Sequence, residues 1–205
     1  MLVFSAQNLA FIAVPKTGTT AIEVALRPRA DIVFAKHRKH MTAQKFHNRL
    51  APFLEKSFGI TPERMAVLRD PEDQIRSWYR YRQGQRQKGS EKSTFDLSFD
   101  EFVRDVISDD PPPHAGIGSQ WNMVTAKGDV LVHHLFAYED RPVFHAFLDA
   151  RFGEPVEVGR KNVSPPVDAP LEDATRKALL RRRAKEFALW QRVRDADGHL
   201  VSDIT

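Results

Sequence analysis

Residues 15–20 combine one cation, one glycine and three hydroxyl side chains, in the order Pro-Lys-Thr-Gly-Thr-Thr. A glycine lets the backbone turn closely around an anion, and a helix that begins after the turn offers free N–H groups and the positive end of its dipole. The lysine adds a full charge, and the threonines add hydrogen-bond donors. This segment therefore predicts a binding site for a terminal phosphate, formed by Lys16, Thr17, Gly18, Thr19 and Thr20. The alternative is an ordinary strand–turn–helix junction with a solvated lysine.

The order of these residues differs from the Walker A loop, which ends in glycine, lysine and serine or threonine. In this chain the lysine precedes the glycine, and no second glycine lies upstream in the loop. The sequence also offers no convincing aspartate for a metal ion at the end of a later predicted strand. A P-loop kinase or nucleotide hydrolase is therefore the second choice among enzymes. A non-catalytic nucleotide-binding module is the alternative outside them.

A second candidate anion site follows a later apolar run. Arg69 comes directly after Val67 and Leu68, and Ser77 lies eight residues beyond it. Open α/β sheets bind ligands at the carboxyl ends of their strands, and the planar guanidinium suits phosphate oxygens. The two sites together predict a ligand with a phosphate at each end of a nucleoside. The alternative is that Arg69 pairs with a nearby acid and that Ser77 faces its own helix.

Short apolar runs and amphipathic stretches alternate along the chain and must position these residues. The predicted strands cover Leu9–Val14, Asp31–Ala35, Met65–Leu68, Val130–Phe136 and a short Val156–Val158. The predicted helices begin after a cap at Thr19 or Thr20, at Thr42, at Pro71 after the N-cap Asp70, after Ser98 and at Pro142. Gly153 closes the last of these helices, and a further, long helix is predicted over Leu171–Val193. This alternation predicts an α/β fold around a mainly parallel central sheet flanked by helices.

The length of 205 residues suits a single domain, and we expect one over residues 1–205 with a C-terminal helical segment at about 171–195. Six basic side chains lie in that segment: Arg176, Lys177, Arg181, Arg182, Arg183 and Lys185. Such a run is typical of a solvated helix face, and attraction of a polyanionic acceptor is the alternative.

Composition narrows the function further. Cysteine is absent, which excludes disulfide scaffolds, thiolate zinc sites, iron–sulfur clusters and cysteine nucleophiles. The 31 basic and 27 acidic side chains leave a formal charge of +4, which suits an anionic ligand without indicating nucleic acid. The apolar run Leu9–Val14 is too short for a membrane span and has no basic flank of the kind that signal peptides carry. We expect a cytoplasmic protein with no nucleic-acid or membrane partner.

Two segments resemble the two donor-binding signatures of sulfotransferases. One is the predicted strand followed by the loop 15–20, and the other is the later predicted strand followed by Arg69-Asp70-Pro71 and a serine. These enzymes use 3′-phosphoadenosine 5′-phosphosulfate (PAPS). Within the superfamily the chain is most similar to carbohydrate enzymes of the heparan sulfate 2-O-sulfotransferase kind and their bacterial relatives. Weaker resemblances follow in the same order: Lys39-His40-Met41-Thr42, Ser98-Phe99-Asp100-Glu101-Phe102, Gln120-Trp121, Tyr138-Glu139 and Lys161-Asn162-Val163-Ser164.

The resemblance implies a P-loop-like three-layer fold and transfer of a sulfuryl group from PAPS to a hydroxyl or amine. The desulfated nucleotide (PAP) would be the product, and no metal would be required. The acceptor stays open between a carbohydrate and another small molecule. The resemblance also implies that Lys161 closes over the 3′-phosphate of the donor, with a basic surface turn as the alternative.

Sulfuryl transfer moves a loosely bound group in line between two oxygens, so positioning and charge stabilisation dominate its catalysis. Lys16 is placed to stabilise the charge that grows on the leaving phosphate. The acceptor must lose a proton, and His40 matches the histidine that the family carries after its second strand; imidazole titrates near neutral pH. His37, one turn away, and His114 are the alternative bases. No metal site is expected, because His37 and His40 have no third and fourth ligands at credible spacing.

Overall fold

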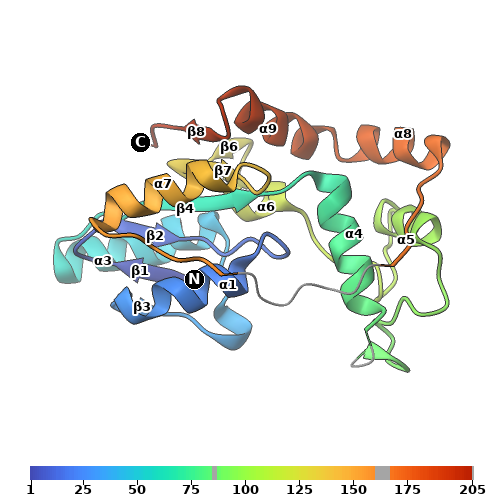
Figure 1. The fold of residues 1–205 in the computed structure, drawn as a ribbon, viewed down its shortest axis with the longest axis horizontal. Helices are drawn as coiled ribbons and strands as arrows, with labels where there is room; N and C mark the ends of the chain where they lie inside the picture. The colour runs from blue at the N-terminus through green and yellow to red at the C-terminus, as the bar shows by residue number, and fades with distance from the viewer. Residues whose placement is uncertain (85–86, 160–166, 205) are drawn as a thin grey trace.

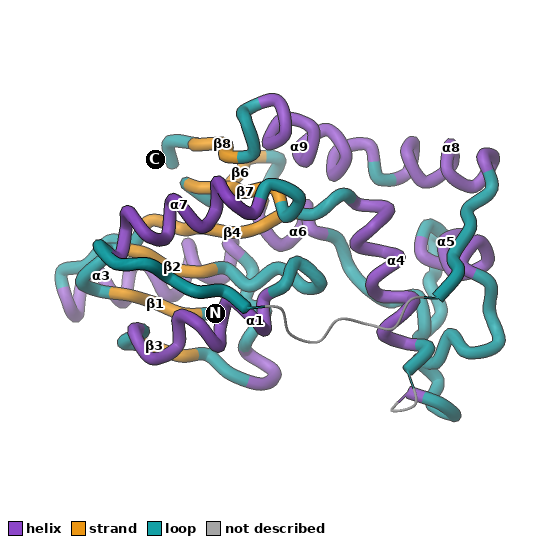
Figure 2. The backbone as a smooth tube through the Cα atoms, viewed as in Figure 1, coloured by secondary structure: helices purple, strands orange, loops and turns teal. Residues whose placement is uncertain are grey.

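The computed structural model describes residues 1–84, 87–159 and 167–204, and it is an α/β protein with helices on both faces of a six-stranded sheet (Figures 1 and 2). The strands lie in the order β3-β1-β2-β4-β7-β8. Their bounds are β1 (Leu2–Phe4), β2 (Leu9–Phe11), β3 (Ile32–Val33), β4 (Glu63–Leu68), β7 (His134–Ala137) and β8 (His199–Val201). A separate ribbon pairs β5 (Thr125–Ala126) with β6 (Asp129–Val130).

The sheet is mixed, which corrects the prediction of a mainly parallel one. Two neighbouring pairs, β2–β4 and β4–β7, are parallel, whereas β1 is antiparallel to both β2 and β3, and β8 is antiparallel to β7. The difference comes from the two strands that the sequence did not predict, β1 and β8. Each is only three residues long, and strands this short carry too little periodicity to recognise.

Helices cover both faces of the sheet, with α1 and α7 on one face and α2, α3, α6 and α9 on the other (Figure 1). Their bounds are α1 (Thr19–Leu26), α2 (Ala43–Lys45), α3 (Ala51–Phe58), α4 (Pro71–Arg82), α5 (Phe99–Val106), α6 (Gln120–Val124), α7 (Arg141–Phe152), α8 (Asp173–Arg182) and α9 (Ala184–Asp195). Shorter turns are the 3-10 turns η1 (Arg27–Arg29) and η2 (Lys36–Arg38) and the π-helical turn η3 (Phe46–Leu50). Within the described ranges, no helix combines the length and apolar composition that a bilayer crossing needs.

Strand geometry explains why the run from Leu9 to Val14 is apolar throughout. Leu9 and Phe11 point to the core beneath α1 and α7, while Ala10 and Ile12 point to the core on the other face. Successive side chains of a strand face opposite sides, so a strand covered on both faces needs apolar residues at every position. The predicted strand therefore lies at the centre of the three layers.

A third core cluster lies beyond the sheet, between α4, α5 and α8 (Figure 1). The long helix predicted over Leu171–Val193 is divided at Arg183 into α8 and α9. The two halves pack on different partners, α8 on α5 and α9 on β7 and β8, so one straight helix cannot serve both. The Arg183 guanidinium stabilises the turn by donating to the carbonyl of Gly118 and to the carboxylate of Glu186.

Local capping signals were predicted well, with one exception. The Asp70 side chain accepts from the Asp73 N–H at the start of α4, Ser98 forms a capping box with Glu101, and Gly153 ends α7 in the left-handed conformation. These predictions are confirmed.

The prediction that Thr19 or Thr20 caps the first helix is wrong. Gly18 occupies the N-cap position with φ 77°, and α1 begins at Thr19 without a side-chain cap. The left-handed glycine turns its own carbonyl toward the helix, where it accepts from the Ala21 N–H at 2.9 Å.

The strands predicted over Leu9–Val14 and Asp31–Ala35 are shorter in the structure, as β2 (Leu9–Phe11) and β3 (Ile32–Val33). Two other predicted strands differ more. The stretch Val130–Phe136 is not one strand but is divided between β6 and β7, which belong to different sheets. The segment Val156–Val158 forms no strand, because the Val156 N–H donates to the carboxylate of Asp149 at 2.7 Å instead of to a neighbouring strand.

Candidate functional site

The first junction, between β2 and α1, is a tight loop with two left-handed residues, Lys16 at φ 68° and Gly18 at φ 77°. A Cβ at Gly18 would lie 3.3 Å from the Tyr138 ring, so the glycine serves both the turn and a close approach. The buried Thr17 hydroxyl donates to the Val14 carbonyl at 2.9 Å. This hydroxyl, one of the predicted phosphate donors, therefore stabilises the loop itself.

The start of α1 has the electrostatic character that an anion requires. Its first hydrogen bonds run from Ala21 and Ile22 to the Gly18 carbonyl, so Thr19 and Thr20 have no intrahelical acceptor for their N–H groups. No acidic residue lies in its first turn, and no side chain caps it. The positive end of the helix dipole therefore faces the loop without an internal carboxylate to neutralise it.

Lys16 is half-buried against α4 rather than merely solvated. Its Nζ lies 3.4 Å from the Tyr81 ring centroid and 4.6 Å from the Trp78 ring centroid, which is cation–π geometry. Burial, together with the nearby Arg82 charge, lowers the pKa of Lys16 to about 8. The ammonium thus stays mostly protonated at neutral pH, although it has lost much of its hydration.

One face of α4 covers this loop. Gln74 donates from Nε2 to the Pro15 carbonyl at 3.2 Å, and Trp78 and Tyr81 follow at helical spacing. None of these three side chains was predicted from the sequence as a site residue. Their spacing of four and then three residues could have indicated a common face, but nothing local shows that the face meets the loop.

The second junction, between β4 and α4, carries Arg69. Its Nη2 lies 4.0 Å from an Asp73 oxygen, the outer limit of an ion pair, while the other Asp73 oxygen pairs with Arg76. The Nε of Arg69 is buried and has no hydrogen-bond partner among the described residues. Ser77 is half-buried one helical turn beyond Asp73. Arg69 therefore has donor capacity that its acidic neighbour does not use.

Tyr138 connects the two junctions. The Arg69 guanidinium carbon lies 4.7 Å from its ring centroid, and the ring packs against Gly18 of the first loop. The Arg141 guanidinium donates to the Tyr138 hydroxyl at 2.8 Å and lies 4.9 Å from the same centroid. The site thus gains a second arginine, Arg141, which the sequence did not indicate as a site residue.

His40 lies at the same edge of the sheet. Its Nδ1 is 2.6 Å from the carbonyl of Ala13, just beyond the end of β2. A carbonyl only accepts, so Nδ1 must carry the proton, and Nε2 is left as an acceptor. Partial burial of the ring lowers the pKa of His40, which favours the neutral imidazole. Both properties suit a general base.

The segment that carries His40 is fixed to α1. The Lys39 ammonium lies 2.8 Å from a Glu23 oxygen and 3.4 Å from the Thr20 hydroxyl. His37 belongs to the turn η2, and His114 pairs with Asp105 of α5 at 2.6 Å. The structure therefore brings His40 to the first loop, whereas the His114 imidazole is held by Asp105 of α5.

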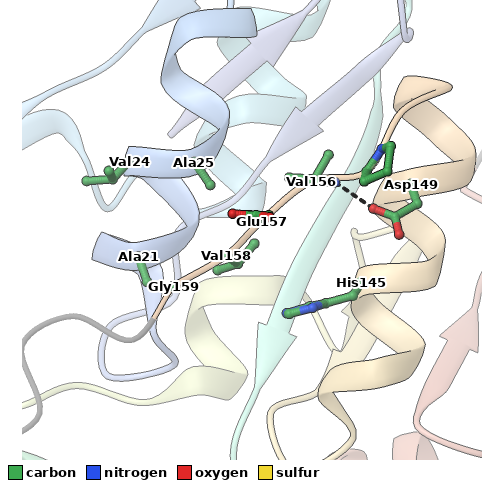
Figure 3. A pocket seen from close by; sticks show the side chains of 10 residues that line it. Ala21, Val24, Ala25, His145, Asp149, Val156, Glu157, Val158 and Gly159 are labelled. Atoms are coloured by element: carbon green, nitrogen blue, oxygen red, sulfur yellow. Dashed lines mark hydrogen bonds between the residues drawn. The ribbon is translucent and has the colours of Figure 1, made fainter.

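A groove of about 590 Å³ lies between α1, α7 and residues 155–159 (Figure 3). Ala21 and Val158 line it on one side and His145 on the other, and a smaller pocket continues from it to Gly18 and Tyr138. Its volume is within the range of small-molecule sites. The groove thus extends from the first loop along α1.

The remaining candidate residues divide into two groups. Lys161 lies outside the described residues. Of the C-terminal basic residues, Arg176 pairs with Glu72 and Arg182 with Asp109. Exposed basic side chains remain at Lys177, Arg181 and Lys185.

No arrangement of three or more His, Asp or Glu side chains suited to a metal ion occurs in residues 1–84, 87–159 and 167–204. Comparisons of the chain with protein-family models, with curated proteins and with solved structures found no match. The function must therefore be inferred from the two junctions and the residues around them.

Proposed function

We propose that this protein is a sulfotransferase that moves a sulfuryl group from PAPS to a hydroxyl or amine acceptor. The P-loop-like character of its fold is part of the same proposal. The first loop would bind the 5′-phosphate, and Arg69 with Ser77 would bind the 3′-phosphate. The groove beside α1 is large enough to accept part of the nucleoside.

The observation that carries the proposal is the pairing of two cationic junctions at one sheet edge. β2 and β4 are adjacent and parallel, so Lys16 and Arg69 both follow the carboxyl ends of neighbouring strands. The Tyr138 ring contacts Gly18 on the first junction and Arg69 on the second. Two anion sites bridged by one ring suit a single ligand with two separate phosphates.

The donor capacity at these junctions supports the same conclusion. A buried N–H without a partner costs about 1–3 kcal/mol, so structures retain such groups mainly where something else satisfies them. The Nε of Arg69 and the Nε1 of Trp78 are both buried without a partner among the described residues. Phosphate or sulfate oxygens are suitable acceptors for both groups.

The chemistry follows from the chain's own residues. His40 would accept the acceptor's proton at Nε2 while the acceptor oxygen or nitrogen forms a bond to sulfur. Lys16 and the N–H groups that begin α1 would stabilise the phosphate oxygen as its bond to sulfur breaks. The Ala13 carbonyl keeps His40 in the tautomer that this role needs.

A kinase or nucleotide hydrolase is less well supported. Such enzymes hold magnesium with an aspartate that follows a later strand. Asp70 follows β4, but its carboxylate caps α4 by accepting from the Asp73 N–H at 2.9 Å. This carboxylate therefore serves as the N-cap of α4 and not as a ligand for magnesium.

Calorimetric titration tests the proposal. We expect PAP to bind without magnesium and more tightly than ATP binds with or without it. Magnesium-dependent binding of ATP in preference to PAP would overturn the assignment in favour of a kinase or hydrolase. Single-turnover transfer of labelled sulfate from PAPS to a panel of sugars, amines and phenols then distinguishes an enzyme from a non-catalytic binding module.

A further inference from the structure

Two fully buried glutamines lie against the two junctions, one at each. Gln74 is 3% exposed and Gln120 is 2% exposed, although glutamine is mostly a surface residue. Gln74 donates to the Pro15 carbonyl in the first junction. Gln120 bonds to the backbone of Arg69 in the second. Burial of an amide is costly unless its polar atoms are satisfied. The backbone of Arg69 satisfies both groups of the Gln120 amide, and the Pro15 carbonyl accepts from the Gln74 amide.

Gln120 holds Arg69 as a neighbouring strand would. Its Oε1 accepts from the Arg69 N–H at 2.9 Å, and its Nε2 donates to the Arg69 carbonyl at 2.9 Å. The ladder between β4 and β7 ends one residue earlier, where the Tyr138 N–H donates to the Leu68 carbonyl at 2.7 Å. The Gln120 side chain thus extends the pairing by one residue and fixes the direction in which the Arg69 side chain leaves the backbone.

Gln120 is itself fixed by α9. Its N–H donates to one oxygen of Glu186 at 3.1 Å, and the Ser119 hydroxyl donates to the other at 2.6 Å. Glu186 is 6% exposed and also pairs with Arg183 at 3.2 Å. A continuous set of hydrogen bonds therefore runs from the α8–α9 turn to the backbone of Arg69.

Gln74 acts on the other junction. It ties the loop to the face of α4 that carries Trp78 and Tyr81, the two rings against which Lys16 lies. Loss of this bond would release the Pro15 carbonyl without touching Arg69 or its partners.

We propose that Gln120 and Gln74 are positioning residues for two different phosphates of one ligand, Gln120 for the 3′-phosphate and Gln74 for the 5′-phosphate. The inference rests on the proposed function, since it presumes a ligand with both groups. It predicts that each substitution weakens the binding of one nucleotide and spares that of another. A purely structural role would not produce this selectivity, because general destabilisation weakens the binding of all ligands alike.

The test compares Gln120→Leu and Gln74→Leu with the wild type, using calorimetric affinities for PAP, adenosine 5′-phosphate and adenosine 3′-phosphate. Gln120→Leu should lower the preference for PAP over adenosine 5′-phosphate by about 10-fold, the equivalent of one strong hydrogen bond. Its affinity for adenosine 5′-phosphate should stay near the wild-type value. Gln74→Leu should weaken adenosine 5′-phosphate and spare adenosine 3′-phosphate.

Gln191→Leu is the matched control, since Gln191 is exposed and donates to Asp195 of its own helix. If Gln120→Leu does not fold, Gln120→Met preserves the length of the side chain and removes both hydrogen bonds. Equal losses for all three nucleotides, or an unchanged preference in the Gln120 variant, would overturn the inference alone. A wild type without preference for PAP over adenosine 5′-phosphate would instead overturn the proposed function.

Discussion

The two junctions have the same order of elements, a strand followed by a helix, but their helices begin in opposite electrostatic settings. The first turn of α1 has neither an acidic residue nor a side-chain cap. The first turn of α4 is capped by Asp70 and carries Glu72 and Asp73. Carboxylates at a helix start satisfy its N–H groups and neutralise its dipole. Of these two helices, α1 is therefore the one whose N-terminus is free to face an external anion, and under the proposed function recognition at α4 would depend on the side chains of Arg69 and Ser77.

Under the proposed function, this difference would give the two junctions two separate tasks. The first junction combines a helix dipole, a desolvated lysine and the nearby imidazole of His40, which suits bond making and breaking. The second junction has an arginine whose backbone is firmly held, which suits recognition. Substitutions at the first junction should therefore affect turnover most, and substitutions at the second should affect affinity.

The largest effect is expected for His40→Ala, which removes the group that would take the acceptor's proton. It should bind PAP normally and transfer sulfate about 100- to 10,000-fold more slowly. The wild-type rate should rise with pH through the pKa of the His40 imidazole, which partial burial lowers. The variant should not show this rise. His37→Ala and His114→Ala should behave almost like the wild type. A large loss in either of them with normal turnover in His40→Ala would identify that residue as the base instead.

Lys16→Ala is expected to have the next largest effect. The charge on the leaving phosphate grows in the transition state, so turnover should fall more than PAP affinity, by about 100- to 1,000-fold. Lys177→Ala removes the same charge from an exposed position on α8 and serves as the control in both measurements. Unchanged turnover at saturating PAPS would show that Lys16 is not the group that stabilises the leaving phosphate.

The smallest effect concerns the opposite, amino-terminal edge of the central strands, where histidines affect stability rather than turnover. His133 accepts from the Arg64 N–H at 2.9 Å, and burial, aided by the Arg64 charge, lowers its pKa from 6.5 to about 4. Because the unfolded chain then binds this proton more readily, the free energy of unfolding should decrease as the pH falls from about 6.5 to about 4. His134 and His199, which contact each other at 3.1 Å beside Glu63, have lowered pKa values and add to the same trend.

Denaturant unfolding at several pH values measures this dependence. His133→Asn keeps an acceptor for the Arg64 N–H and removes the titrating group, so the slope of unfolding free energy against pH should become smaller. A slope identical to that of the wild type would show that His133 does not contribute. Activity corrected for the folded fraction should follow the titration of His40 in both proteins.

The sequence was most informative where the signal is local. The caps at Asp70 and Ser98 and the closing Gly153 depend on neighbours within a few residues, and the structure has them as predicted. The central run Leu9–Val14 is buried as predicted, although the strand β2 covers only Leu9–Phe11. The short strands β1 and β8 and the division of the last helix depend on which distant elements pack together. No periodicity within the segments themselves contains that information.

The same distinction holds for the candidate site. Lys16 and Arg69 could be singled out because each follows an apolar run and begins a helical pattern. The positions of Tyr138, Arg141 and Gln120 in the site could not be predicted from the sequence. They depend on long-range packing, which places β7 beside β4 and α6 against the end of β4. Tyr138 and Gln120 were noted in the sequence only through weak resemblances.

If each junction binds one phosphate of the same nucleotide, Arg69→Ala should change the affinity for one nucleotide and spare another. The measurement is the ratio of calorimetric affinities for PAP and for adenosine 5′-phosphate. The wild type should prefer PAP strongly, and Arg69→Ala should lose about 10- to 100-fold of that preference, the equivalent of one or two charged hydrogen bonds. Its affinity for adenosine 5′-phosphate should be nearly unchanged. An equal loss for both nucleotides would contradict the assignment of separate phosphates to the two junctions.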